Sequence, residues 1–394
     1  MTGSDAGGTT IQEDCSVTER PISVLIVDDS ALMRNLVSRV FDSAPGFRVA
    51  GTAMNGQFAL KKIEQLAPDL IILDLEMPEM NGLEFLLERQ RRGITIPVII
   101  LSSIAEKGAR VTMEALSLGA SDFVLKPGGA TSAYDMKDAA AELVELARIY
   151  GRPPMQEASR TRPPDIEYFP EVEEGSRVPA APVQRPAVRV KSPPPLRGPG
   201  PIEVVAIGIS TGGPNALRQL LPKLDEDFSP PVLVVQHMPA GFTGEFAESL
   251  DRICALDVRE AKDGDVIQSG RVLIAPGDAH MWVEAKPLAH IVRLSDDPPV
   301  SGHRPSVDVL FGSVARVYGN RCLAVIMTGM GRDGATQIGS IYREGGTTLA
   351  QDETSCVVFG MPRAAIEAGV VSSVVSLSEM ADAIKRLSRE HPPA

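Results

Sequence analysis

The chain has 394 residues, of which 43% are hydrophobic, and its 39 basic and 51 acidic side chains give a formal net charge of −12. This length exceeds that of one ordinary domain, so two or three folded units are expected. The acidic balance excludes a nucleic-acid-binding surface, which needs clustered lysine and arginine. Every apolar run is much shorter than the roughly 20 residues that span a bilayer, so no direct membrane insertion is expected.

The N-terminal segment, residues 1–20, is polar and acidic and lacks the apolar core of a secretory signal. We expect it to be a disordered leader. The cysteines are scattered and show no CxxC spacing of the kind found in zinc or redox sites: Cys15, Cys254, Cys322 and Cys356. A reduced, cytoplasmic location is therefore expected.

Residues 21–149 alternate short apolar runs with helical patterns, which predicts a parallel α/β sheet covered on both faces. The predicted strands are 22–27, 47–53, 69–74, 97–103 and 122–126. The predicted helices lie near 30–42, 55–66, 81–92, 106–118 and 133–149. This region is therefore expected to be one doubly wound domain.

Carboxylates stand at two strand ends of this first domain, where ligands of parallel sheets usually bind. Asp28 and Asp29 follow the first strand and Asp74 ends the third. Converging carboxylates are best tolerated around a hard cation such as Mg²⁺, beside which an aspartate can accept a phosphoryl group. For Asp28 and Asp29 alone, capping of the helix that starts near Ser30 is an alternative.

Two further polar groups follow later strands of the same sheet. Ser102 offers a hydroxyl for a phosphoryl oxygen, and Lys126 offers a positive charge. The pieces VDDS (27–30), DLEMPEMNG (74–82), LSS (101–103) and LKP (125–127) together resemble the receiver domain of two-component response regulators, which is flavodoxin-like. Residue 81 is Asn where relatives often carry Asp, and either side chain can cap the helix predicted there.

The receiver resemblance implies phosphorylation of Asp74 by a partner histidine kinase. It implies Mg²⁺ held by Asp29, Asp74 and the backbone carbonyl of Glu76, with Asp28 assisting. It also implies a phosphorylation switch in which Ser102 and Phe123 move, with Lys126 contacting the phosphoryl group.

Residues 150–200 are rich in proline and follow no apolar period, which indicates a semi-stiff linker. The α/β rhythm resumes in residues 201–394 and predicts a second doubly wound parallel-sheet domain. Its predicted strands are 203–209, 231–236, 271–276, 322–328, 347–352 and 369–375. Its predicted helices lie near 214–224, 241–255, 305–317, 334–342, 361–367 and 378–390.

Three strand ends of the second domain carry a serine, a histidine and an aspartate. Ser210 lies in the turn GISTGGP (208–214), His237 follows the next strand, and Asp333 lies in the loop TGMGRDG (328–334). Such a set can form a nucleophilic hydrolase, since the triad is defined by geometry and role. Taken singly, the glycine-rich turn could cradle a phosphate, and Asp333 could simply form a turn.

The segments GISTGG (208–213), QHMP (236–239) and TGMGRDG (328–334), together with the order of receiver, linker and second domain, resemble the protein-glutamate methylesterases of bacterial chemotaxis. The resemblance implies a phosphorylation-activated hydrolase that removes methyl groups from glutamate γ-methyl esters of methyl-accepting chemoreceptors, releasing methanol, and that deamidates receptor glutamines. Ser210, His237 and Asp333 would be the catalytic triad. The amide of Met330 would bind the oxyanion with Thr211 assisting, and no cofactor would serve the esterase site.

Three alternative functions are compatible with parts of the second domain's sequence. One is a binding module that holds a nucleotide or phosphate at the 208–213 turn, and a second is a DNA-binding response regulator, which the acidic α/β sequence disfavours. The third is a metallohydrolase using His280, His290 or His303 with Asp333, although no HxH or HExxH spacing supports it. In the methylesterase reading, the unphosphorylated receiver is expected to sit against the catalytic cleft and to release it on phosphorylation.

Overall fold

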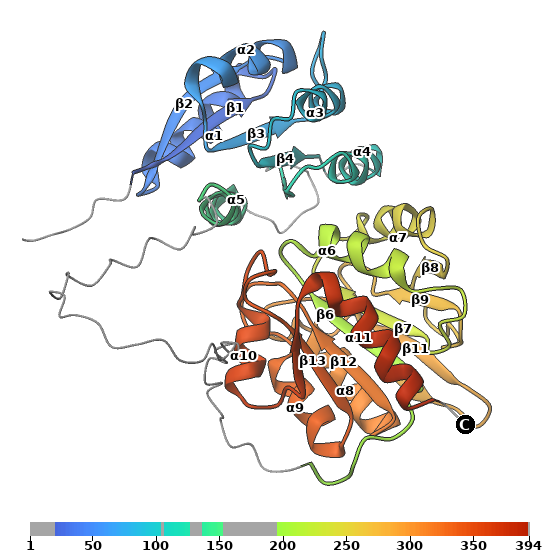
Figure 1. The fold of residues 1–394 in the computed structure, drawn as a ribbon. Helices are drawn as coiled ribbons and strands as arrows, with labels where there is room; N and C mark the ends of the chain where they lie inside the picture. Colours follow the sequence, from blue (N-terminus) through green and yellow to red (C-terminus); the bar gives the residue numbers. More distant parts are fainter. Residues whose placement is uncertain (1–19, 104–105, 127–135, 153–194, 393–394) are drawn as a thin grey trace, which may run out of the picture.

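The computed structural model describes residues 20–103, 106–126, 136–152 and 195–392. These residues form two parallel α/β domains, one above the other in Figure 1. The predicted fold class is confirmed. The predicted leader, apart from Arg20, and most of the predicted linker lie outside the described residues.

The first domain is built on a five-stranded parallel sheet in the order β2-β1-β3-β4-β5. The strands are β1 Ile22–Val27, β2 Phe47–Ala53, β3 Leu70–Asp74, β4 Val98–Ser102 and β5 Asp122–Leu125. The helices are α1 Ala31–Ser43, α2 Gly56–Leu66, α3 Gly82–Arg91, α4 Glu106–Ser117 and α5 Met136–Tyr150. Every residue of β1, β3, β4 and β5 is buried, which explains why these strands appear in the sequence as continuous apolar runs.

Polar residues at the strand–helix junctions fix where the helices of this domain begin. The Ser30 hydroxyl accepts a hydrogen bond from the Met33 amide at the start of α1. Asn81 forms a capping box with Glu84 at the start of α3. The prediction that Asn81 can cap this helix is thus confirmed.

The second domain has a seven-stranded parallel sheet in the order β14-β13-β12-β6-β7-β9-β8 and a separate antiparallel hairpin, β10-β11. The strands are β6 Val204–Ile209, β7 Val232–Gln236, β8 Asp257–Glu260, β9 Arg271–Ile274, β10 His280–Ala285, β11 His290–Ser295, β12 Cys322–Ile326, β13 Thr347–Gln351 and β14 Ser373–Val375. The helices are α6 Gly213–Leu220, the 3₁₀ helix η1 Leu221–Lys223, α7 Thr243–Asp251, α8 Val307–Tyr318, α9 Ala335–Glu344, α10 Met361–Glu367 and α11 Leu377–Glu390.

Three strands of the second domain were not predicted from the sequence, and one predicted strand is shorter in the structure than expected. The strands β8, β10 and β11 are only partly buried, so their sequences lack the continuous apolar run that marks the central strands. The strand predicted at 369–375 was too long, because only Ser373–Val375 pairs with β13. The reason is local: Gly369 has φ +69°, which turns the chain before the strand begins.

The sheet order of the second domain determines where its ligand site lies. The central strand β6 pairs with β7 on one side and with β12 on the other. The chain therefore leaves β6 in one direction and returns later on its other side, and crevices at such switch points bind ligands. Ser210 directly follows β6 at this point.

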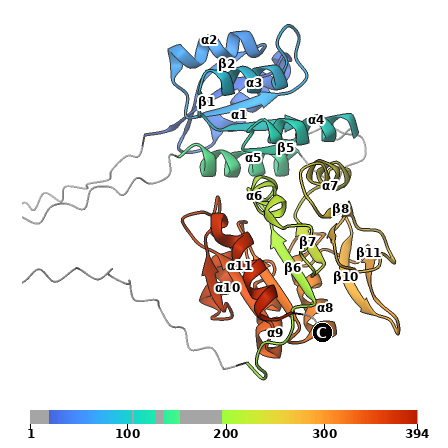
Figure 2. The same cartoon turned by 45° about the vertical axis from the view of Figure 1, so that its right-hand side comes forward.

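The two domains pack directly against each other. Figure 1 and Figure 2 show α4 and α5 of the first domain beside α6 and α7 of the second. The ring of Phe123 stacks on that of Phe242, with centroids 5.0 Å apart and planes at 10°. The side-chain amide of Asn215 donates hydrogen bonds to the backbone carbonyls of Ala120, at 3.0 Å, and Ser121, at 3.1 Å.

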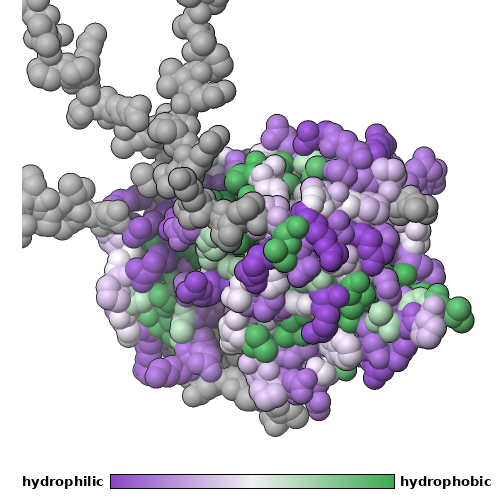
Figure 3. Space-filling view, turned by 90° about the horizontal axis from the view of Figure 1, so that it is seen from below, coloured by the Kyte–Doolittle hydropathy of each residue, from purple (hydrophilic) through white to green (hydrophobic). Residues whose placement is uncertain are grey.

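The face of the second domain opposite the first is mainly hydrophilic, with apolar side chains in small separate groups (Figure 3). Among the residues that the structure describes, no helix has the length and apolar composition needed to cross a membrane.

The Asn215 contacts predict how the domain interface responds to mutation. Asn215→Ala removes two interdomain hydrogen bonds, each worth about 0.5–1.5 kcal/mol net. We expect a smaller fraction of molecules to have the two domains packed together. The radius of gyration, measured by small-angle X-ray scattering, should therefore rise. The matched control is Asn320→Ala, because Asn320 donates to Gly198 within the second part of the chain. Equal radii for the two variants would contradict the interface.

Candidate active site

Ser210 lies in a sharp turn between β6 and α6. Its amide donates to the carbonyl of Thr328 at 2.9 Å, and its carbonyl accepts from the amide of Gly213 at 2.8 Å. Gly212 has φ +74°, a conformation that favours glycine. The loop after β12 approaches so closely that a Cβ on Gly329 would lie 2.7 Å from the Ser210 Cβ. Glycines on both sides therefore allow the serine to sit between two loops.

The structure brings together the three residues proposed as a triad. The Nδ1 atom of His237 lies 3.1 Å from Ser210 Oγ, and its Nε2 atom lies 2.8 Å from Asp333 Oδ2. His237 directly follows β7, and Asp333 lies in the loop after β12. The hydroxyl, imidazole and carboxylate thus form one hydrogen-bonded chain at the carboxyl ends of neighbouring strands.

Asp333 is buried at the N-terminus of α8, where backbone amides point at it. Its carboxylate accepts hydrogen bonds from the hydroxyl of Ser306 at 2.8 Å, the amide of Val307 at 2.7 Å and the amide of Asp308 at 3.1 Å. Burial alone would raise the pKa of Asp333, but the contact with His237 and the two amides together hold it below its usual value. The carboxylate therefore stays ionised beside the imidazole.

Ser306 is a site residue that the sequence patterns did not single out. It is the N-cap of α8, yet its side chain makes no capping bond and donates to Asp333 instead. A serine near the start of the helix predicted at 305–317 was the available sequence signal, and a serine at such a place usually caps the helix.

Gln236 is a second residue that the sequence patterns missed. Its buried side-chain amide donates to the backbone carbonyls of Ser210 and His237, both at 3.0 Å. It thus ties the serine turn to the histidine loop. A polar residue at the end of an otherwise apolar strand was the only sequence signal.

A cavity of about 960 Å³ opens in front of the triad and is lined by both domains. Ser210, Thr211, His237 and Met330 line it from the second domain. Within the described residues, neither Thr211 nor Met330 donates its backbone amide in a hydrogen bond. The family resemblance implied that the Met330 amide binds the oxyanion with Thr211 assisting, and both amides are therefore free to bind a developing negative charge.

The first domain reaches the serine turn itself. The carboxylate of Asp122, at the start of β5, accepts a hydrogen bond from the amide of Gly212 at 3.3 Å and from the hydroxyl of Tyr150 at 3.1 Å. Leu146 and Ile149 of α5 line the same cavity as Ser210. The docked first domain therefore forms one wall of the cavity that a substrate would enter.

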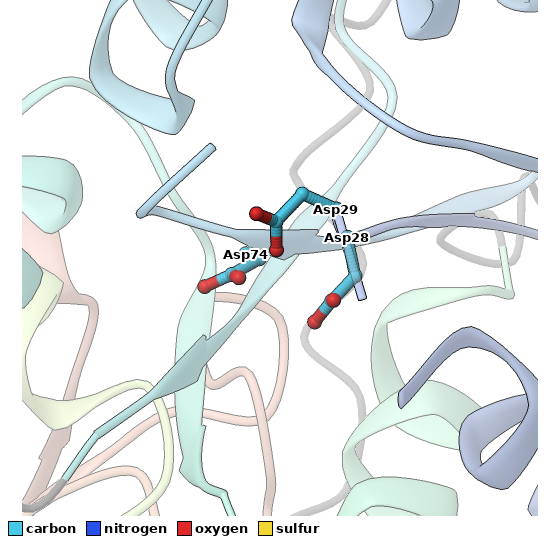
Figure 4. Close-up of side chains that lie close together, drawn as sticks. All are labelled: Asp28, Asp29 and Asp74. Atoms are coloured by element: carbon cyan, nitrogen blue, oxygen red, sulfur yellow. The ribbon is translucent and has the colours of Figure 1, made fainter. Parts of the chain in front are cut away.

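The acidic site of the first domain is also assembled. Asp28, Asp29 and Asp74 each offer a carboxylate oxygen, and these oxygens lie within 4.8 Å of one another (Figure 4). Lys126 Nζ lies 2.8 Å from Asp74 Oδ2 and 3.3 Å from Asp28 Oδ2. Burial raises the pKa of Asp74, and the nearby Lys126 opposes that rise.

The other residues proposed for the first-domain site lie around this cluster. The Ser102 hydroxyl is buried and lies 2.6 Å from the hydroxyl of Thr112 on α4. The ring of Phe123 points to the domain interface, where it stacks on Phe242. The Glu76 side chain is exposed and lies 3.9 Å from Lys107 Nζ.

The histidines considered for a metallohydrolase are not gathered around Asp333. The Nε2 atom of His280 lies 3.2 Å from the carbonyl of Pro298, and His290 packs edge-on against Tyr318. His303 lies beside His237 and stacks on its ring. Across the described ranges, the group found with three or more possible metal ligands is Asp28, Asp29 and Asp74.

The geometry of the second-domain site suits nucleophilic acyl transfer. The imidazole of His237 can take the Ser210 proton at Nδ1 while its Nε2–H donates to Asp333. The carboxylate holds the ring in that tautomer and stabilises the cation that forms. Thr211 and Met330, whose amides are unengaged within the described residues, line the same cavity, so the parts of a serine hydrolase are present.

Comparison with known proteins identifies both domains. The CheB methylesterase family matches residues 205–384, and the response regulator receiver domain family matches residues 24–136. A "protein-glutamate methylesterase/protein-glutamine glutaminase" of Treponema denticola is 53% identical over 94% of this chain and 99% of its own. The protein of the same name from Treponema pallidum is 50% identical over 93% of this chain and 97% of its own.

A solved structure, the CheB methylesterase catalytic domain of Thermotoga maritima, is 39% identical. It covers 47% of this chain and 98% of its own, with a TM-score of 0.47.

The hydrogen bond from Ser306 predicts a measurable loss of serine reactivity. Ser306→Ala removes a hydrogen bond to a charged acceptor, worth about 1.5–3 kcal/mol, so Ser210 should react with a fluorophosphonate about ten- to a hundredfold more slowly. Ser340→Ala is the control, because Ser340 donates within α9 to Gln337. If both variants were labelled as fast as the unmodified protein, Ser306 would have no part in orienting Asp333.

Proposed function

The chain belongs to the receiver-linked CheB methylesterases, and from this premise we propose that Ser210, His237 and Asp333 hydrolyse glutamate γ-methyl esters of chemoreceptors through an acyl-enzyme. The observation that carries the proposal is the continuous hydrogen-bonded chain from Ser210 Oγ through His237 to the buried Asp333. Ser210 and His237 line a cavity that is large enough to admit a side chain of a protein substrate.

In the first half of the reaction, Ser210 Oγ attacks the ester carbonyl carbon as His237 Nδ1 accepts its proton. The carbonyl oxygen becomes an oxyanion, for which we propose the amides of Thr211 and Met330 as donors, since both residues line the cavity and neither amide is engaged within the described residues. A single donor of this kind is typically worth about 3–4 kcal/mol. His237 then protonates the departing methoxide, methanol leaves, and an acyl-enzyme remains.

In the second half, His237 takes a proton from a water molecule as that water attacks the acyl carbonyl carbon. The bond from this carbon to Ser210 Oγ then breaks, His237 returns the proton to Oγ, and a free glutamate leaves. A glutamine side chain would pass through the same acyl-enzyme with ammonia as the leaving group. The deamidase activity carried in the relatives' names therefore needs no additional residue.

In the receiver domain we propose that Asp74 accepts the phosphoryl group from a histidine kinase and that Mg²⁺ binds beside it. Asp28, Asp29, Asp74 and the backbone carbonyl of Glu76 would hold the ion, which neutralises charge on the phosphoryl oxygens. The residues fit a hard cation: three carboxylates converge, and the one positive group that the structure describes beside the buried Asp28 Oδ2 is Lys126 Nζ, at 3.3 Å. Lys126 would contact the bound phosphoryl group.

We propose that the docked receiver limits the access of receptor helices to the cavity. The support is direct, because Asp122 bonds to the serine turn and α5 lines the cavity. Phosphorylation of Asp74 would recruit the Ser102 hydroxyl away from Thr112 and shift Phe123, which weakens the Phe123–Phe242 stack. We place the enzyme in the cytoplasm, at the cytoplasmic parts of chemoreceptors.

The first prediction from this proposal concerns the nucleophile. Ser210→Ala removes the attacking oxygen, so methanol release from methylated receptor membranes should fall by at least about 10³-fold. Binding of those membranes should be retained. Retained methanol release would contradict the acyl-enzyme and would favour a binding module instead.

A second prediction concerns the phosphorylation site. Asp74→Asn cannot accept a phosphoryl group, so acetyl phosphate should leave its methanol release at the basal level while activating the unmodified protein. Asp69→Asn is a suitable control, because Asp69 lies at the other end of β3 and contacts Arg20 and Ser23. Activation of the Asp74 variant by acetyl phosphate would place the phosphorylation elsewhere.

A third prediction follows from a buried carboxyl at the domain interface. Burial raises the pKa of Asp122 to about 6. Asp122 lies against the amide of Gly212 in the second domain, so separation of the domains would expose it to water and lower its pKa. The docked state therefore binds this proton more tightly than the separated state. Docking should be strongest at low pH and should weaken as the pH rises through this pKa.

The measurement is the rate of methanol release without acetyl phosphate, divided by the rate with acetyl phosphate at the same pH. This ratio should rise between pH 5 and 8. Asp122→Asn should flatten this rise, since the amide does not titrate there. A ratio independent of pH in the unmodified protein would contradict the prediction.

A further inference from the structure

The loop between β11 and α8 places a second histidine against the catalytic one. The rings of His303 and His237 stack with their centroids 3.8 Å apart and their planes at 10°. The backbone of His303 is fixed by two hydrogen bonds with Val300, of 3.0 and 3.1 Å. This histidine therefore lies on a held loop, and its ring covers one face of the His237 imidazole.

His303 is half-buried and lines the same cavity as Ser210. Its side chain makes no hydrogen bond within the described part of the chain, so its position depends on the stack and on packing. Burial, followed by the charge of His237, lowers the pKa of His303 to about 4. At neutral pH its ring is therefore uncharged.

We propose that His303 is a positioning residue for the esterase reaction, one that holds the His237 ring in the plane of the Ser210–Asp333 chain by stacking on its face. The inference rests on the proposed triad and adds a residue to which none of the comparisons gives a role. Asp333 fixes one ring nitrogen of His237 but leaves the ring able to swing about that hydrogen bond. A flat neighbour on the ring face removes that freedom.

The reaction gives the stack a second consequence. When Ser210 attacks, the proton moves from its Oγ to His237 Nδ1, and the imidazole becomes a cation. A neutral aromatic face attracts such a cation, whereas a charged neighbour would repel it. Because His303 is uncharged at neutral pH, it can lie against the His237 ring without repelling the cation that forms during the reaction.

Two variants separate stacking from hydrogen bonding. His303→Phe keeps a flat ring but has no polar atoms, while His303→Gln keeps polar atoms but has no ring. Both are made in the full chain, with acetyl phosphate present. The measurements are kcat and KM for methanol release from methylated receptor membranes and the rate at which a fluorophosphonate labels Ser210.

For His303→Gln we expect kcat and the labelling rate to fall about tenfold, with KM within about twofold of the unmodified protein, because ring orientation acts on the chemical step. For His303→Phe we expect both rates to stay within about threefold. The labelling rate matters because it depends on activation of Ser210 and needs no receptor.

The proposal is overturned if His303→Phe loses as much activity as His303→Gln, since a polar or proton-carrying role would then be indicated. It is overturned as well if His303→Gln keeps full kcat, or if only KM rises. Failure of the proposed function gives a different result: the unmodified protein itself would show no labelling of Ser210.

Discussion

The buried carboxylate of Asp333 is the constraint on which the proposed esterase site depends. A charge held away from water is tolerated because His237, the hydroxyl of Ser306 and two amides of α8 surround it. These donors come from two segments, the loop after β7 and the start of α8, while Asp333 itself lies in the loop after β12. The Asp333 carboxylate therefore holds three segments in place relative to one another: the loop after β7, the start of α8 and the loop after β12. The turn that carries Ser210 is connected to them through its hydrogen bond with His237.

The parallel sheet of the second domain determines how the loops that carry the three site residues are brought together. Because β6, β7 and β12 are neighbours and run in one direction, the loops that follow them meet at one edge. The same logic gathers Asp28, Asp74 and Lys126 in the receiver domain. The same arrangement of parallel strands thus produces the proposed phosphorylation site and the proposed esterase site within one chain.

The sequence was sufficient to predict the fold class, the central strands and the residues at their ends. Buried parallel strands are marked by continuous apolar runs, and polar residues that follow them are easily noticed. Ser306, Gln236 and the stack of His303 on His237 were not predictable, because each depends on contacts between segments far apart in the chain. The partly exposed strands β8, β10 and β11 were missed since they lack an apolar run.

Strand β5 links the two sites over a very short path. Asp122 at its first position bonds to the amide of Gly212, and Lys126, directly beyond its last position, pairs with Asp74. Each residue of a parallel strand adds about 3.3 Å to its length, so the extended segment that joins these two contacts is about 13 Å long. If Asp74 is phosphorylated as proposed, a small tilt of β5 would carry the change straight to the turn that holds Ser210, without a relay through the rest of either domain.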